Sequence, residues 1–302
     1  MTLTIATARL LEPAPGLLVF YDGRVTGRRA YAAEPNWIDD GAYGLGIAAF
    51  AIIDSTDALI YDTHMSIAHA QWMRDTLTSR GVRTMRVVLS HSHLDHVAGN
   101  AVFQDCEIIA HRLTALAMAE KRAHIEDGSY DGPPAIKPLV MPTSLFEGTH
   151  ELMVGRRRIE LHHMDIHSRD GVVLVLPDDG LLLAGDTLED TITYVAEPER
   201  LEIHLGDLAR LAALGARRIL PNHGDRDRLA AGGYDPSLIT ATERYVRRLI
   251  DASQRPAGSD EPLLTFVAPE LAAGSITYYA PYEAVHARNL AVVRSSRQPR
   301  AG

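Results

Sequence analysis

Cysteine is almost absent from this sequence. Cys106 is the only one among 302 residues, so the chain can form no internal disulfide and no metal site built from thiolates alone. Any metal that the protein binds must therefore rest on histidine and carboxylate side chains.

Long apolar runs and positive charge are also scarce. No stretch reaches the roughly 18 apolar residues of a membrane helix, and Met1 to Gly16 lacks a basic segment followed by an apolar one. The chain has 30 basic and 39 acidic residues, a net charge of -9, and only two lysines, which argues against a surface that tracks nucleic-acid phosphates. We expect a cytoplasmic protein that acts on a small molecule and binds neither nucleic acid nor membrane. Its oligomeric state stays open, a homodimer included.

Hydrophobic residues are plentiful at 46%, enough for a substantial core, and they follow a repeated order. In the first segment two strands joined by a hairpin turn precede a helix and a third strand, at Ala48–Ile53, Ala58–Tyr61, Ile67–Ser79 and Met85–Leu89. The second segment has the same order, at Val172–Leu176, Leu181–Ala184, Glu202–Leu214 and Arg218–Leu220.

Each half delivers an aspartate at the end of one strand and a histidine at the end of another, namely Asp62 with His91 and Asp186 with His223. Strand ends beside helices are where α/β proteins place their ligands. Short apolar strands that alternate with helical patterns indicate buried sheets covered by helices. We therefore predict an α/β fold, a four-layer αββα sandwich, with one catalytic domain over residues 1–294.

Three other segments complete the expected organisation. Residues 118–146 read as irregular structure and form a candidate lid or insertion. After His223 we expect a helix over Ser237–Ala252 and a terminal helix near Pro262–Ala273. Residues 295–302 are expected to form a frayed tail.

The stretch from Ser90 to His96 places four potential metal ligands within six residues, directly after an apolar strand. His91 and His93 point the same way in an extended chain, so they can chelate one ion. Asp95 and His96 lie where the chain turns into a helical pattern over Val97–Phe103 and can point toward a second ion.

His167, Asp186 and His223 each follow a strand-like run or precede a turn, and they complete a set of seven. Seven ligands cannot all reach one tetrahedral ion. Imidazole with carboxylate suits zinc, and also iron or manganese.

These motifs, in this order, resemble the metallo-β-lactamase fold superfamily over roughly residues 45 to 225. The resemblance implies two zinc ions per chain, one bound by His91, His93 and His167, the other by Asp95, His96 and His223, with Asp186 bridging both. Asp62 matches the superfamily's first motif and would orient a ligand histidine. The third motif departs from the usual Gly-His-Thr/Ser-Pro-Gly, but His167 is still preferred, because His162 and His163 lie inside the preceding strand-like run.

Two ions about 3.5 to 4 Å apart can share a hydroxide as nucleophile, so the resemblance implies a hydrolase. Asp95 is placed to orient the hydroxide or carry a proton to the leaving group. Tyr194 corresponds to a tyrosine that supports the substrate in some lactone-cleaving relatives. Two further features are candidates for the substrate pocket. An apolar flap over the site would be formed by Trp37, Ile38 and Tyr43. A substrate carboxylate would be bound by Arg169.

The expected substrate is a small organic molecule with a lactone, ester or amide bond, β-lactam-like bonds included. One alternative is a glyoxalase II-like thioesterase, which keeps the same ligand set, although no basic tail is identifiable after residue 240. The other is a mononuclear iron persulfide dioxygenase, in which His91, His167 and Asp186 would hold one iron. Metal content separates the two-zinc hydrolase from the dioxygenase.

Overall fold

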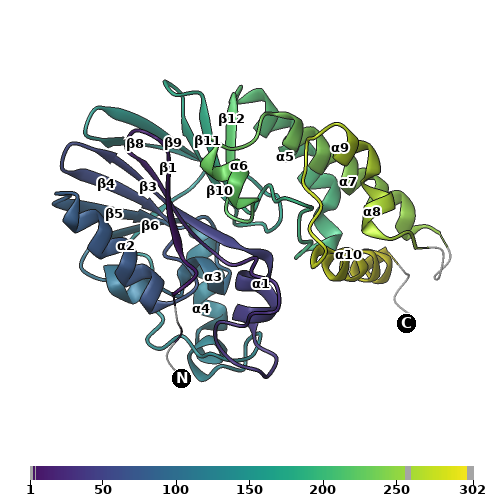
Figure 1. The fold of residues 1–302 in the computed structure, drawn as a ribbon, viewed down its shortest axis with the longest axis horizontal. Helices are drawn as coiled ribbons and strands as arrows, with labels where there is room; N and C mark the ends of the chain where they lie inside the picture. The colour runs from purple at the N-terminus through teal and green to yellow at the C-terminus, as the bar shows by residue number, and fades with distance from the viewer. Residues whose placement is uncertain (1–2, 4, 256–259, 298–302) are drawn as a thin grey trace.

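Two β-sheets packed face to face form the centre of the computed structural model, which describes residues 3, 5–255 and 260–297 (Figure 1). The first sheet has its strands in sequence order: β1 (Arg9–Ala14), β2 (Leu17–Asp22), β3 (Ile47–Asp54), β4 (Asp57–Tyr61), β5 (Thr84–Val88), β6 (Glu107–His111) and β7 (Ser144–Phe146). The second has the order β12 (Arg218–Pro221), β11 (Leu181–Gly185), β10 (Val172–Leu176), β9 (Arg157–His163) and β8 (Thr149–Val154).

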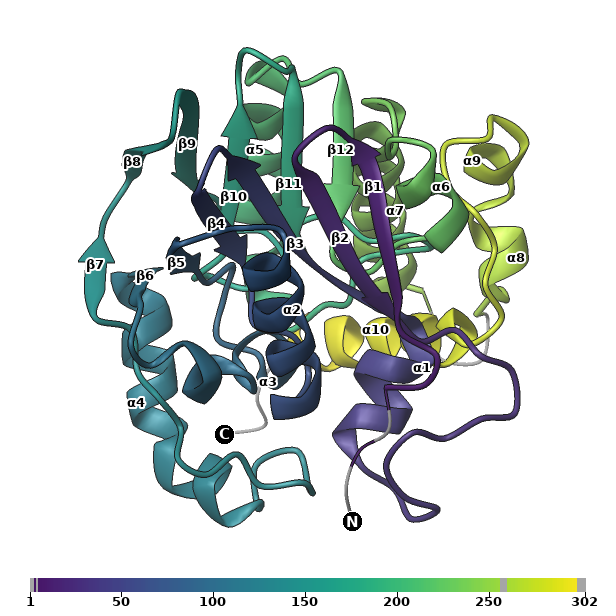
Figure 2. The same ribbon diagram turned by 60° about the vertical axis from the view of Figure 1, so that its left-hand side comes forward.

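Helices cover the outer faces of both sheets (Figure 2). The N-terminal half contributes α1 (Tyr43–Leu45), α2 (Ile67–Ser79), α3 (Leu94–Val97) and α4 (Arg112–Asp127), with a π-helical turn at Ile38–Ala42 and a 3₁₀ turn at Asn100–Phe103. The C-terminal half contributes α5 (Leu201–Ala213), α6 (Arg226–Ala230), α7 (Ser237–Ser253), α8 (Leu263–Phe266), α9 (Ala268–Ala272) and α10 (Tyr282–Arg297), with a 3₁₀ turn at Pro198–Arg200. This is the predicted αββα sandwich.

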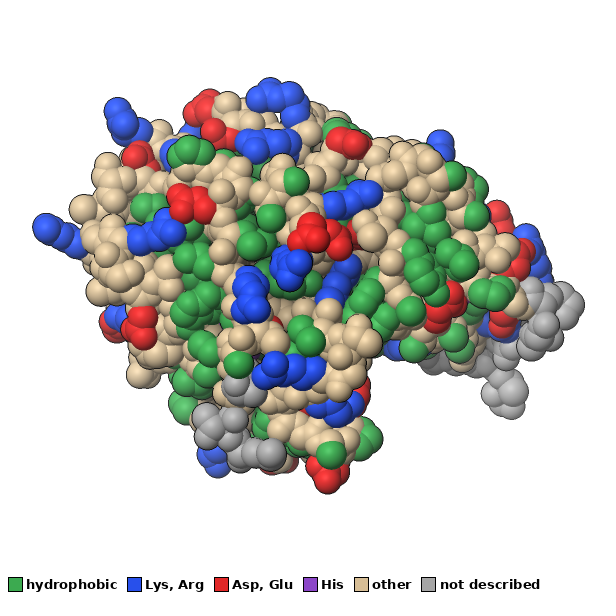
Figure 3. Space-filling view, viewed as in Figure 1, with side chains coloured by type: hydrophobic (Ala, Val, Ile, Leu, Met, Phe, Trp, Pro, Cys, Tyr) green, Lys and Arg blue, Asp and Glu red, His purple; other side chains and the backbone are tan. Residues whose placement is uncertain are grey.

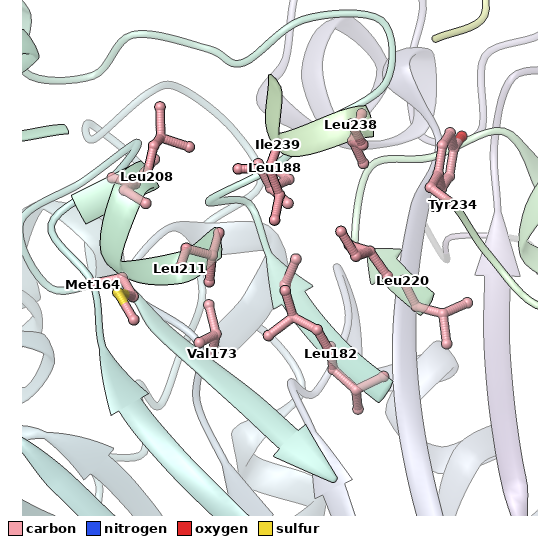
Figure 4. Close-up of a cluster of buried hydrophobic side chains, with 14 of the residues drawn as sticks. Met164, Val173, Leu182, Leu188, Leu208, Leu211, Leu220, Tyr234, Leu238 and Ile239 are labelled. Atoms are coloured by element: carbon pink, nitrogen blue, oxygen red, sulfur yellow. The ribbon is translucent and has the colours of Figure 1, made fainter. Parts of the chain in front are cut away.

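The hydrophobic pattern explains the layers. Every residue of β2 is buried, yet Leu17 and Val19 belong to the core between the sheets, while Leu18 and Phe20 belong to the core under α2 and α4. A strand buried on both faces reads as a continuous apolar run. On the other side, residues of α5 and α7 pack on the outer face of the second sheet, as Figure 4 shows for Leu208, Leu211, Leu238 and Ile239 over Val173, Leu182 and Leu220.

The repeated order of elements is real, and it positions the site. In the first half β4 and β5 pair in parallel, and in the second half β11 and β12 do the same. Parallel neighbours end at the same edge of a sheet, so each half presents two loops there. The predicted strands and helices of both halves match the observed bounds to within one or two residues.

Several expectations for the connecting segments were wrong. Residues 118–127 are not irregular, because α4 extends to Asp127, and 144–146 form β7. The helical pattern over Val97–Phe103 is split between α3 and a 3₁₀ turn. The helix expected near Pro262–Ala273 is two short helices, α8 and α9. The long terminal helix is α10, which includes residues 295–297 of the expected tail; residues 298–302 lie outside the described part.

Candidate metal centre

Asp62, directly after β4, joins three loops at the common edge of the sheets. Its Oδ1 accepts a hydrogen bond from the backbone N–H of Ser90 (2.6 Å), after β5, and its Oδ2 accepts one from Nδ2 of Asn222 (2.6 Å), after β12. Nδ1 of His96 lies 2.8 Å from the same Oδ2. Asp62 and His167 both have left-handed backbone, with φ of +66° and +67°. Such strained conformations cost about 1–3 kcal/mol and cluster at functional sites.

All seven ligands predicted from the sequence meet at this edge. They form two groups, within each of which the candidate ligand atoms lie no more than 4.8 Å apart: His91, His93, His167 and Asp186 in one, and Asp95, His96 and His223 in the other.

Asp186 lies between the two groups. Its Oδ2 is close to Nε2 of four histidines, at 3.1 Å for His96, 3.3 Å for His223, and 3.7 Å for both His91 and His167. Gly185 allows this approach: its φ is +57°, and a Cβ there would lie 2.7 Å from the hydroxyl of Tyr61 and 3.0 Å from Cβ of Ser90. Both the backbone conformation and the close packing require glycine.

Neighbouring groups hold the outer nitrogen of most of these rings. Nδ1 of His223 donates to the carbonyl of Gly46 (2.7 Å), and Nδ1 of His167 donates to the carbonyl of Tyr194 (3.0 Å). Nδ1 of His91 lies 2.9 Å from Oγ of Ser90. A ring that donates through Nδ1 presents the lone pair of Nε2, which is how proteins usually orient a metal-binding histidine.

The donor set fits divalent transition metals. Within the described residues, Nε2 of His91 and Oδ1 of Asp186 are buried without a hydrogen-bond partner, and such buried polar atoms are costly unless something else binds them. Burial, together with the neighbouring rings of His96 and His93, holds the pKa of His91 well below its usual value. Burial and His167 lower the pKa of His93 to about 3. Both rings are therefore neutral near pH 7 and available as ligands.

The comparison with known proteins agrees with this geometry. Residues 44–223 match the family model of the metallo-beta-lactamase superfamily. The chain belongs to this superfamily. Among curated proteins no relative is detected.

Solved metallo-β-lactamases share the fold. One from Pontibacter korlensis is 16% identical, with a TM-score of 0.60, and the match covers 80% of this chain and 99% of that one. TMB-1 is 18% identical, with a TM-score of 0.60 and coverage of 81% and 99%. DIM-1, in a crystal exposed to ceftazidime, is 18% identical, with a TM-score of 0.59 and coverage of 82% and 99%. At these identities the likeness concerns the fold.

In this metallo-β-lactamase fold the candidate metal centre opens into a cavity of about 870 Å³. Two of the predicted pocket residues, Trp37 and Arg169, line it, as does Tyr194, which was predicted to be catalytic. The prediction was wrong for Ile38 and Tyr43, which are each 1% exposed and pack in a small core beneath the flap with Met65.

Trp37 of the flap is tied to another segment that borders the cavity. Nε1 of Trp37 donates to the carbonyl of Pro134 (3.0 Å), which lies in the segment 128–143 between α4 and β7. Asp131 and Tyr130 of that segment line the cavity. The part of the candidate lid that lacks helix and strand therefore borders the site.

Sequence reasoning missed two carboxylates that hold the site loops. Oδ2 of Asp170 accepts from the backbone N–H of Ser92 (2.9 Å). Oε1 of Glu189 accepts from the backbone N–H of Tyr194 (2.7 Å) and lies 3.4 Å from Nδ1 of His167. Both follow a predicted ligand by three residues, which is the only sequence signal that would have pointed to them.

Asp165, Glu197 and His204 form a third group with ligand-like spacing, of which Glu197 lines the cavity. Arg200 already pairs with both carboxylates, since its guanidinium donates to Asp165 and its Nε lies 3.9 Å from Oε2 of Glu197. Arg169 also meets this group, with Nε 3.8 Å from Oε1 of Glu197. We therefore interpret it as a set of ion pairs.

Within the described residues no helix is long and apolar enough to cross a membrane.

Proposed function

We propose that this protein is a hydrolase that uses two zinc ions to cleave a lactone, ester or amide bond in a small organic substrate. The observation that carries the proposal is Asp186, whose Oδ2 lies between two groups of ligands at the base of a cavity. His91, His93 and His167 would hold one ion, and Asp95, His96 and His223 the other, with Asp186 shared. When bound, such ions lower the pKa of water and polarise a carbonyl.

The side chains supply proton transfer and positioning. The side chain of Asp95 is 16% exposed and lies between two ligand rings, with Oδ2 3.2 Å from Nε2 of His223 and Oδ1 3.5 Å from Nε2 of His96. From this position at the cavity it can orient the attacking water or carry a proton to the leaving group. Burial raises the pKa of Tyr194 despite the opposing charge of Arg288. The phenol therefore stays protonated at neutral pH and can donate to the oxygen on which negative charge develops.

The cavity suits an organic molecule more than a phosphodiester. Its wall combines Trp37, Leu94 and Val285 with few unpaired cations, and the whole chain has two lysines and a net charge of -9. Phosphoryl substrates usually require a basic field.

The test is a panel of lactones, aryl esters, thioesters, a chromogenic β-lactam and bis-nitrophenyl phosphate on zinc-loaded protein. We expect the best catalytic efficiency on a carboxylic derivative, and Tyr194→Phe should lower it by roughly 100-fold, as loss of one such donor does elsewhere. A phosphodiester that is the best substrate by an order of magnitude would overturn the substrate class. One iron per chain with oxygen consumption would overturn hydrolysis.

A further inference from the structure

Arg288 lies on the cavity wall but outside the residues that match the superfamily model. It belongs to α10, which begins nearly sixty residues after the model ends at 223, and it lines the same cavity as Tyr194 and the ligand cluster. Figure 1 shows α10 with α7, α8 and α9 at one end of the molecule. The C-terminal helices therefore add a wall to the site that the family motifs do not supply.

The guanidinium of Arg288 is held in place. Its central carbon lies 3.8 Å from the ring centroid of Tyr194, and Nη1 donates to the carbonyl of Val195 (2.8 Å). The next residue, Asn289, fixes the same loop: its Oδ1 accepts from the N–H of Val195 (3.0 Å), and its Nδ2 donates to the carbonyl of Thr193 (2.8 Å). A side chain that is already ordered loses little conformational entropy when it binds a ligand.

Among the cations that line the cavity, Arg169 has a carboxylate within ion-pair distance, whereas neither Arg288 nor Lys121 has one in the described part of the chain. Arg169 lies near Glu197 (3.8 Å). Nζ of Lys121 donates to the hydroxyl of Tyr130 (2.6 Å) and lies 4.6 Å from its ring centroid. The basic side chains visible on one face in Figure 3 are interspersed with acidic ones. The charge of Arg288 is thus available to a bound molecule.

The same helix offers apolar surface next to this charge. Ala284 and Val285 precede Arg288 by one turn and also line the cavity, because residues three and four apart share a helix face. A guanidinium binds a carboxylate through two parallel hydrogen bonds.

We propose that Arg288 receives a carboxylate of the substrate, so that the substrate is a carbonyl compound whose cleavable bond and carboxylate are separated by an apolar segment. This rests on the proposed hydrolysis at the metal centre. The sequence predicted that Arg169 binds the substrate carboxylate. We assign this role to Arg288 instead, because Arg169 lies near Glu197. Asp131 also lines the cavity, and its charge acts on Tyr194, so it is an acidic group that would oppose a substrate carboxylate near Arg288.

The test uses two esters of matched length, mono-4-nitrophenyl adipate and neutral 4-nitrophenyl hexanoate, on zinc-loaded wild type, Arg288→Met, Asp131→Asn and the control Arg247→Met. Arg247 is exposed on α7 and pairs with Glu243. We expect Arg288→Met to lower kcat/KM for the adipate ester roughly 10- to 100-fold, as loss of a charged hydrogen bond does, mainly through KM, with little change for the hexanoate ester. Asp131→Asn should raise kcat/KM for the adipate ester relative to the hexanoate ester. Arg247→Met should leave kcat/KM for both esters unchanged.

Equal losses on both esters in Arg288→Met would overturn the proposal, since Arg288 would then only anchor the Tyr194 loop. Equal efficiency of wild type on the two esters would also overturn it. If wild type cleaves neither ester, that result contradicts the proposed hydrolysis and not the carboxylate site. The site is then tested by calorimetry, which measures the binding of monomethyl adipate. Binding that is lost in Arg288→Met supports the site, and absence of binding to wild type overturns it.

Discussion

Nδ1 of His96 lies 2.8 Å from Oδ2 of Asp62, and both side chains are fully buried. The contact joins the end of β4 to the helical turn that follows β5. It fixes the ring of His96 so that Nε2 lies 3.1 Å from Asp186. The aspartate that follows β4 in the first half thus orients a ligand toward the aspartate that follows β11 in the second half.

The first prediction concerns metal content. Purified protein reconstituted with zinc should hold close to two ions per chain, because seven ligands in two groups exceed what one tetrahedral ion can use. His93→Ala and His223→Ala should each lower the content, as measured by elemental analysis. His124→Ala, on exposed α4 surface, is the matched control and should keep both ions. Full occupancy in His93→Ala and His223→Ala would contradict the ligand assignment.

The second prediction separates an orienting carboxylate from a shared ligand. Asp62→Ala should weaken zinc binding by about 10- to 100-fold, as loss of a partner of a metal-bound histidine does, and Asp186→Ala should weaken it more. Asp62→Ala should also be less stable, because the buried N–H of Ser90 and amide of Asn222 lose their acceptor. Zinc competition titrations on the folded variants measure the two zinc affinities. A larger loss in Asp62→Ala than in Asp186→Ala would refute the orienting role of Asp62 and the shared-ligand role of Asp186.

The third prediction concerns Glu189, which is 1% exposed and links α10 to the site. Its Oε2 accepts from the hydroxyl of Tyr282 (3.2 Å), while Oε1 holds Tyr194 and approaches His167. Glu189→Gln should reduce zinc affinity by about 10-fold or more, since it weakens the partner of a ligand ring. Tyr282→Phe should have a smaller effect in the same direction.

Tyr278→Phe is the control for this pair, because the hydroxyl of Tyr278 donates to Glu283 and not to Glu189. Zinc affinity and kcat/KM are measured for all three variants. Wild-type values in Glu189→Gln would show that the carboxylate has no part in positioning His167.

The fourth prediction is a pH dependence away from the metal centre. His111 stacks on His163 with ring centroids 4.0 Å apart, and burial together with His163 lowers the pKa of His111 to about 4. The unfolded chain, with a pKa of about 6.5, binds this proton more readily. The stability that neutral His111 contributes is therefore complete above about pH 6.5 and is lost as the pH falls toward 4.

His111→Asn removes this titration and keeps an acceptor for the N–H of Leu113 at the start of α4. The melting temperature of wild type relative to His111→Asn should fall between pH 7 and pH 4. His124→Asn, which is exposed, should follow wild type. A constant difference across this range would contradict the assignment.

Much of the site was determined by the sequence. The ligands occur in short strings directly after apolar strands, and strand ends can be read from hydrophobic patterning. Asp62, His91, Asp186 and His223 were therefore assigned to strand ends, and the structure places them together. The two halves were visible because each repeats the same local order of strand, turn, strand and helix.

Tertiary structure alone decided the surroundings of that site. Ile38 and Tyr43 have the same apolar character as Trp37, yet only Trp37 reaches the cavity, because the turn of residues 38–42 directs the others into a core. Arg288 follows the last ligand by 65 positions, and no local pattern relates it to Tyr194. Which charge stays unpaired depends on contacts between elements distant in sequence, and those contacts form only when the helices pack on the sheets.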